Sequence, residues 1–329
     1  MIRLGLNIAD YRGDRKRNAF ERLAELVVAG EAAGFDSFFA GDHLMSDKAA
    51  PDGQWLELYT TLAALAARTT SIKFGALVGA VLFRNPALLA KTVTSLDVIS
   101  HGRAIFGIGS GSHEGEHRAY GYDFPPPADR LAILEETVAL VKAMFGGGPT
   151  TVAGKWVRTE AALNQPPPIT PGGPPVMIGG TGRRTLRLVA RYGDIANFAA
   201  DDKLVPEINA VLDEHCADIG RDPSTITRTM FKPVILAKTR QEAEAVMTPW
   251  QREHQDLLGI VTGGPDDVAG QFRDLRNAGI DGLIVQLPAA HNTADRITEL
   301  GHLLSPIVAD GVPAVTRGEI DGATRTDMA

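Results

Sequence analysis

Short apolar runs alternate with longer segments of helical period along most of this chain, and this alternation constrains the fold most strongly. Strands that are apolar throughout are typical of a parallel sheet that helices cover on its outer face. Eight such units in succession predict an α/β fold, a (β/α)8 TIM barrel. The expected strands are 2–9, 35–40, 72–78, 103–108, 176–178, 194–198, 226–236 and 281–287.

A doubly wound open sheet is the alternative fold. It does not need eight regular units, and its dinucleotide-binding form carries a G-x-G-x-x-G motif after the first strand. No such motif follows residues 2–9 in this chain. The barrel is therefore the favoured interpretation.

We expect one barrel domain over residues 1–309. The expected helices are 18–33, 56–68, 86–100, 129–145, 183–192, 203–219, 240–277 with a break at 263–265, and 294–304. Residues 146–174 interrupt the alternation with GGGP and QPPPITPGGPP, so we expect an insertion loop there, with a possible hairpin at 151–157. Residues 310–329 are polar and lack periodicity, which predicts a disordered tail.

Composition excludes several classes of protein. The 329 residues include 33 basic and 40 acidic side chains, so the net charge of −7 favours neither nucleic acid nor an anionic membrane as a partner. The single cysteine, Cys216, excludes an intrachain disulfide framework and a cysteine-based zinc site. The chain shows neither a secretory signal nor an apolar run long enough to span a membrane, so we expect a soluble, cytoplasmic protein.

Unusual residues follow three of the predicted strands, at the barrel end where TIM-barrel chemistry occurs. Asp42 and His43 follow the second strand, the segment GIGSGSHEGEH (107–117) follows the fourth, and GGTGRR (179–184) follows the fifth. The last segment opens a helix, and free N–H groups at a helix N-terminus bind phosphate well. These clusters predict a phosphorylated ligand lying across the barrel mouth.

Each cluster also has a purely structural interpretation. Asp42 and His43 could serve only a turn, and the segment 179–184 could be a tight entry into a helix. His113, Glu114, Glu116 and His117 could form the solvated face of a short helix. This segment lacks the H-E-x-x-H spacing, so we expect no metal site. The chain also lacks a G-x-S-x-G elbow and a P-loop, which argues against hydrolases and kinases.

Taken together, these segments resemble the luciferase-like monooxygenase superfamily, in particular its branch that uses the deazaflavin coenzyme F420. The matching stretches include AELVVAGEAAGFDSFFAGDHLM, FRNPALLAKTVTSLDVISHGRAIFGIGSG and PPVMIGGTGRRTLRLVARYGDIANF, and looser matches continue to about residue 305. The resemblance implies a bacterial-luciferase-type barrel with insertions at its C-terminal face. It also implies a homodimer.

The resemblance further implies where the cofactor lies. Asp42 would hold the cofactor head, the Leu77–Val78 bond would be a non-prolyl cis peptide beneath the ring, and the segment after residue 178 would bind the phosphate. The implied cofactor-binding residues are Asp42, Leu77, Val78, Gly109, Ser110, Gly111, Gly179, Gly180, Thr181 and Gly182.

The implied activity is hydride transfer between the deazaflavin and a small organic substrate. His43 would be the catalytic residue that handles the proton, with His113 and Glu114 as alternates. Ser112 stands where sugar-phosphate dehydrogenases of this branch carry a catalytic Glu, so the acid partner and the substrate are both unassigned. An FMN-dependent monooxygenase using O2 and a non-catalytic flavin- or deazaflavin-binding protein are the alternatives.

Overall fold

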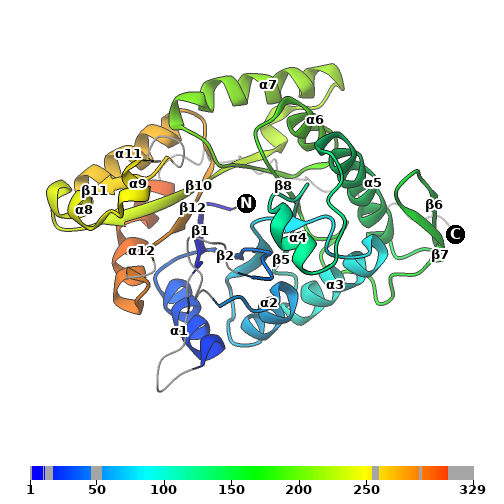
Figure 1. Ribbon diagram of the computed structural model, residues 1–329, viewed down its shortest axis with the longest axis horizontal. Coiled ribbons are helices and arrows are strands. Elements are labelled where there is room, and N and C mark those ends of the chain that lie inside the picture. The colour runs from blue at the N-terminus through cyan, green and yellow to red at the C-terminus, as the bar shows by residue number, and fades with distance from the viewer. Residues whose placement is uncertain are drawn as a thin grey trace, which may run out of the picture.

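The fold is a parallel barrel with helices around it, as Figure 1 shows for this computed structural model. The structure describes residues 2–9, 11, 18–45, 54–253, 259–288 and 291–309. Within these residues eight parallel strands close on themselves, since the first pairs with the last. In spatial order they are β1 (Leu4–Asn7), β2 (Ser37–Ala40), β3 (Lys73–Ala76), β5 (Ala104–Gly109), β8 (Val176–Gly179), β9 (Ile195–Phe198), β10 (Thr227–Leu236) and β12 (Gly282–Gln286). The predicted TIM barrel is confirmed.

Helices follow the strands and form the outer layer (Figure 1). The longer ones are α1 (Ala19–Ala32), α2 (Leu58–Ala66), α3 (Pro86–Ile99), α5 (Pro127–Phe145), α6 (Arg183–Tyr192), α7 (Val205–Asp218), α8 (Arg240–Val246), α11 (Pro265–Asn277) and α12 (Ala294–Ala309). Short helical pieces are α4 (Glu114–Ala119), α9 (Pro249–Glu253), η1 (Asp202–Leu204) and η2 (Pro223–Thr225).

Local sequence explains where several helices begin. The Asn18 side chain accepts a hydrogen bond from the Glu21 N–H at 2.9 Å and so caps α1. Asn85 caps α3 in the same way, and Pro86 occupies the first helical position, where its missing N–H costs nothing.

The apolar core has a small cluster inside the barrel, a larger one between the barrel and the helices, and a third that packs the end of β10 against α8. The small inner cluster contains Phe39, Ile105, Met177 and Ile284, all at most 1% exposed, and Leu77 and Val78 pack against it. The larger outer cluster runs from Leu4 to Val308. The inner cluster therefore carries Leu77 and Val78, which form part of the candidate site described below.

Two predicted elements need correction. The helical region expected over 240–277 is wrong in part, because it contains α8, α9, the strand β11 (Val261–Gly263) and α11. β11 pairs with the end of β10 outside the barrel, and three residues are too few to show a strand period. The hairpin in the insertion is longer than expected, with antiparallel strands β6 (Thr150–Ala153) and β7 (Arg158–Ala162).

The predicted disordered tail, 310–329, lies outside the described residues. Among the helices that the structure describes, none is both long and apolar enough to cross a bilayer.

Candidate active site

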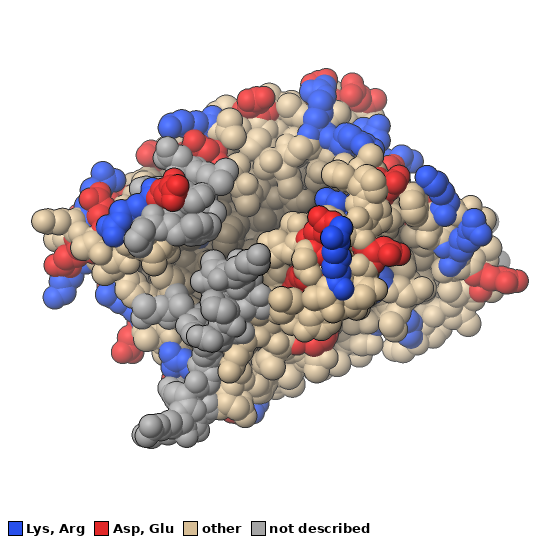
Figure 2. Space-filling view, in the orientation of Figure 1, with Lys and Arg blue, Asp and Glu red and all other residues tan. Residues whose placement is uncertain are grey.

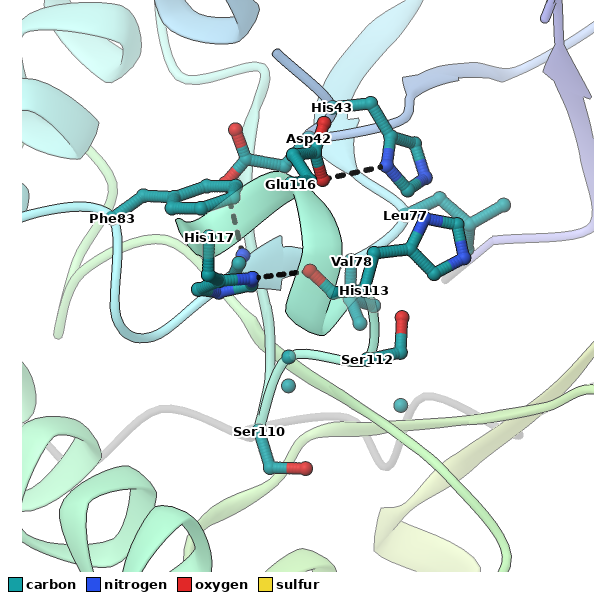
Figure 3. Close-up of a pocket in the computed structure, with 14 residues that line it drawn as sticks. Asp42, His43, Leu77, Val78, Phe83, Ser110, Ser112, His113, Glu116 and His117 are labelled. Carbon is teal, nitrogen blue, oxygen red and sulfur yellow. Dashed lines mark hydrogen bonds and ion pairs between the residues drawn. The ribbon is translucent and has the colours of Figure 1, made fainter. Parts of the chain in front are cut away.

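A cavity of about 220 Å³ opens at the C-terminal end of the barrel, between the segments that follow β2, β3 and β5 and the end of β8. Figure 2 shows the face that carries this opening, with acidic and basic side chains gathered over α4 beside it. Figure 3 draws the residues that line the cavity. The lining residues are Asp42, His43, Leu77, Val78, Ala80, Phe83, Gly109, Ser110, Gly111, Ser112, His113, Glu116, His117 and Gly179.

The Leu77–Val78 segment forms an apolar shelf on one side of the cavity. The peptide bond between these residues is cis, as the resemblance implied. The Leu77 N–H donates to the Ala40 carbonyl at 2.9 Å, which ties the shelf to the end of β2. A Cβ atom at Gly109 would lie 2.7 Å from Val78 Cγ2, and one at Gly179 would lie 2.9 Å from it. Glycine at both positions therefore makes room for Val78.

Asp42 is buried and already has strong partners. Its two carboxylate oxygens accept from both terminal nitrogens of Arg84, at 2.6 and 3.0 Å, in the bidentate geometry typical of strong pairs. The Ala80 N–H donates to the same carboxylate at 2.9 Å. Burial alone would lower the pKa of Arg84, but its hydrogen bonds to the carboxylates of Asp42 and Glu57 raise it above its usual range. Asp42 thus fixes the segment that follows the shelf, and its contact with a cofactor stays a prediction.

His43 is held by the carboxylate of Glu116, to which the sequence analysis assigned no role in the site. Its Nδ1 lies 3.2 Å from Oε2 of Glu116, a side chain that is only 5% exposed (Figure 3). The other oxygen of Glu116 accepts from the backbone N–H groups of Leu44 and Met45. The Tyr120 hydroxyl donates to the Leu44 carbonyl at 2.8 Å. α4 and the segment beyond it therefore fix both the ring of His43 and its loop.

The expectation of a solvated face for residues 113–117 is wrong for Glu116 and His117, which are 6% and 1% exposed. His117 stacks on Phe83 with ring centroids 4.4 Å apart, and its Nδ1 donates to the His113 carbonyl. Glu116 could not be found from the sequence because its partners lie 71 to 73 residues away, on another loop.

The two alternate catalytic residues lie in different places. The His113 ring faces the His43 ring with centroids 4.8 Å apart, so His113 belongs to the cavity. Glu114 does not line the cavity; its half-exposed side chain pairs with Arg118 at 2.6 Å on the outer face of α4. The Trp55 ring contacts the His43 ring edge-on, with centroids 4.9 Å apart. The His43 ring therefore contacts two other aromatic rings.

The predicted phosphate turn lies beside the cavity. Gly179 is in its lining, whereas Gly180, Thr181 and Gly182 are not. Gly182 is the N-cap residue of α6 and has no side chain that could cap this helix. Helix N-termini have backbone N–H groups without intrahelical partners, so this end of α6 offers donors to an anion.

The sequence model of a family described as luciferase-like monooxygenase matches residues 6–257. A phthiodiolone/phenolphthiodiolone dimycocerosates ketoreductase from Mycobacterium sp. (strain JLS) is 29% identical in an alignment of 328 positions that covers 92% of this chain and 81% of the relative.

Two relatives have names that include a cofactor. An F420-dependent hydroxymycolic acid dehydrogenase from Mycobacterium tuberculosis is 30% identical, and the match spans 63% of this chain and 56% of the relative. An F420-dependent glucose-6-phosphate dehydrogenase from Mycobacterium avium is 26% identical over 84% of this chain and 91% of the relative.

Solved structures share the fold at lower sequence identity. An F420-dependent secondary alcohol dehydrogenase in complex with an F420-acetone adduct superposes with a TM-score of 0.76 at 19% identity, over 93% of this chain and 99% of that one. A monooxygenase from Streptomyces bottropensis gives 0.77 at 19% identity, over 94% and 99% of the two chains. One fold thus carries both kinds of enzyme, so fold alone does not select between them.

Proposed function

This chain belongs to the luciferase-like monooxygenase family, and we propose that it is an oxidoreductase that uses coenzyme F420 to transfer a hydride to or from a small organic substrate. The observation that carries the proposal is the imidazole of His43, oriented by the buried Glu116 over a cavity with an apolar shelf. Two relatives support F420 as the cofactor because their names include it. Their matches span 63% and 84% of this chain.

The residues present fit such a cofactor. The Leu77–Val78 shelf offers an apolar surface for a flat ring, and Gly109, Ser110 and Gly111 form an adjacent wall with little side chain. The uncapped N-terminus of α6 at Gly182 would bind the phosphate through backbone N–H groups. A bound deazaflavin would supply the hydride donor or acceptor.

His43 would handle the proton that accompanies the hydride. Since a carboxylate only accepts, the ring bonded to Glu116 carries a hydrogen on Nδ1, and in the neutral ring Nε2 then keeps a lone pair. An imidazole can both take and give a proton near neutral pH. Contacts with the rings of Trp55 and His113 restrict rotation of the His43 ring.

The names of the relatives also support a class of reaction. They are called ketoreductase or dehydrogenase, and these activities interconvert a hydroxyl and a carbonyl. We infer an alcohol–carbonyl pair as the substrate class for this chain. We also propose that the protein forms a homodimer, that it is cytoplasmic and that residues 1–309 form one domain.

Cofactor and substrate tests can be made separately. Purified protein would be titrated with F420 and with FMN while the cofactor's fluorescence is followed. We expect tight binding of F420 and weak binding of FMN; the reverse preference would support a monooxygenase and overturn the proposal. If the protein binds F420 but turns over none of a panel of alcohols and ketones, this would indicate a non-catalytic deazaflavin-binding protein.

The role of His43 is tested with His43→Ala, using His302→Ala on the exposed face of α12 as the matched control. His43→Ala should bind F420 nearly as well as the wild type and lose roughly 10²–10⁴-fold in turnover, the usual contribution of a positioned acid or base. A wild-type hydride-transfer rate in this variant would remove His43 from the mechanism.

A further inference from the structure

Three side chains with atoms that bind metals converge at the edge of the cavity. His43 comes from the loop after β2, while His113 and Glu116 come from the loop after β5 and from α4. One ring nitrogen from each histidine and one oxygen of Glu116 all lie within 4.8 Å of one another. The expectation that this chain has no metal site considered only spacing along residues 113–117, and the fold adds His43 from another loop.

The distances suit a small tetrahedral ion. Zinc binds histidine nitrogen and carboxylate oxygen at about 2.0–2.2 Å, so two ligands of a tetrahedral ion lie about 3.3–3.5 Å apart. His43 Nδ1 and Glu116 Oε2 are already 3.2 Å apart. The His113 side chain is exposed and does not cap α4, so it can rotate toward the other two.

The donor set and its surroundings also favour zinc. Two imidazoles and one carboxylate form a ligand set that zinc enzymes use, with a fourth position left for water. The N–H groups of Leu44 and Met45 hold the second oxygen of Glu116, which orients the carboxylate as outer partners do in metal sites. The cavity provides the open position.

We propose that His43, His113 and Glu116 form a reversible inhibitory site for Zn²⁺. The ion would replace the hydrogen between His43 Nδ1 and Glu116 Oε2, and the neutral ring would then carry its hydrogen on Nε2. That nitrogen has no lone pair in this form and does not accept a proton. Binding of the metal depends only on the geometry, whereas the inhibition rests on the proposed function of His43.

Binding is measured on metal-free, full-length protein by competition for Zn²⁺ with a chromophoric chelator. We expect one equivalent of Zn²⁺ per chain, and at least ~10-fold weaker binding in His113→Asn, since even changes to outer partners cost about that much. The matched control is His101→Asn, an exposed histidine with φ of 55°, where asparagine is well tolerated. Equal affinity in wild type and His113→Asn would overturn the site.

Co²⁺ in place of Zn²⁺ gives an independent spectroscopic readout, because the strength of its visible absorption reports four-coordination. The wild type should show these bands and His113→Asn should lose them. If the folded wild-type protein shows no absorption bands of four-coordinate Co²⁺, the proposed geometry is wrong.

Inhibition is measured last, with F420 and an active substrate. Zn²⁺ should abolish turnover of the wild type, and EDTA should restore it. Zn²⁺ that binds at one equivalent without slowing turnover would contradict the inhibitory role and would count against His43 as the proton-handling residue, while the metal site itself would stand.

Discussion

At the scale of single residues, two buried carboxylates beside the cavity have different partners. Asp42 is neutralised by Arg84 and fixes the backbone after the Leu77–Val78 shelf. Within the described part of the chain, Glu116 pairs with no lysine or arginine; it accepts from His43 and from two backbone N–H groups of the His43 loop. Only Glu116 is therefore in a position to select the tautomer of the histidine.

The substitution Glu116→Gln should change the tautomer of the His43 ring. The amide oxygen of Gln would still accept from Leu44 and Met45, but its NH₂ group would face His43 Nδ1 and favour the tautomer with hydrogen on Nε2. Turnover should fall by roughly 10²-fold, within the range of a positioned acid or base, while F420 affinity stays unchanged. The pH dependence of turnover should also change, which a purely structural defect would not produce.

The matched control for this prediction is Glu114→Gln, on the same short helix but with an exposed side chain. It should keep wild-type turnover and pH dependence. If both variants behave alike, Glu116 has no specific role in orienting His43.

The sequence predicted part of this site. His43, Asp42 and the glycine-rich segments were found because each follows an apolar strand and matches a known family. Glu116 was missed because its significance comes from hydrogen bonds to Leu44 and Met45, which no local pattern records. The resemblance implied that Gly109 binds the cofactor. The structure adds a second reason for glycine at this position, because a Cβ atom there would lie too close to Val78.

At the scale of elements, the N-terminus of α6 carries the proposed phosphate site. Gly182→Val should weaken F420 binding by about 1–3 kcal/mol, through lost or distorted hydrogen bonds to a charged group. Gly182 has a φ of −66°, and only Thr185 Oγ1 comes near an added Cβ, at 3.9 Å, so the fold should tolerate the change. Gly180 is a poorer test, because its φ of +130° strains any branched side chain.

Fluorescence titration with F420 measures this effect, and Gly148→Val, at a glycine with open space around it, serves as the control. Inorganic phosphate should compete with F420 in the wild type. Unchanged affinity in a folded Gly182→Val protein would place the phosphate elsewhere.

Glu31 connects α1 to the segment before β3 and gives a prediction on pH. Its carboxylate accepts from the N–H groups of Thr70, Ser71 and Ile72 at 2.6 to 3.0 Å. Burial alone would raise the pKa of Glu31, but these hydrogen bonds lower it from 4.5 to about 2. Because the pKa is depressed in the folded state, the stabilisation is present above about pH 4.5 and is lost as the pH falls toward 2.

Glu31→Gln should therefore lower the free energy of unfolding at neutral pH by about 1 kcal/mol, a modest value because the group is partly exposed. The difference from the wild type should shrink as the pH falls below about 4.5. Urea unfolding at several pH values measures it, with Glu160→Gln on the exposed face of β7 as control. A pH-independent difference would show that the charge of Glu31 is not its cause.

The elements themselves were largely predictable because the barrel strands are apolar and the helices have clear periods. β11 was not predictable, since its three residues form a strand only by pairing with the end of β10. Short strands of this kind depend on a neighbour that the local sequence does not reveal.

At the scale of the whole molecule, the barrel joins the two ends of the described chain. β1 pairs with β12 in parallel register, from Leu4 opposite Leu283 to Asn7 opposite Gln286. α12 then packs on α1, where Gly301 allows close approach to Ala33. The barrel is therefore closed by its first and last strands, and we expect folding to require the chain through α12.

The last prediction compares two truncations. A chain that ends at Ala309 keeps all of α12 and the outer core cluster through Val308, so it should unfold in one transition near the wild-type temperature and bind F420 normally. A chain that ends at Thr293 loses Ile297, Leu300 and Leu304, each 0% exposed. Three such side chains contribute roughly 5–9 kcal/mol at about 1.5–3 kcal/mol each, comparable with the whole stability of a domain. The shorter chain should therefore fail to fold, as circular dichroism during heating would reveal. Unfolding of the longer truncation would show that residues 310–329 belong to the folded unit, and a stable shorter one would show that closure of the barrel does not need α12.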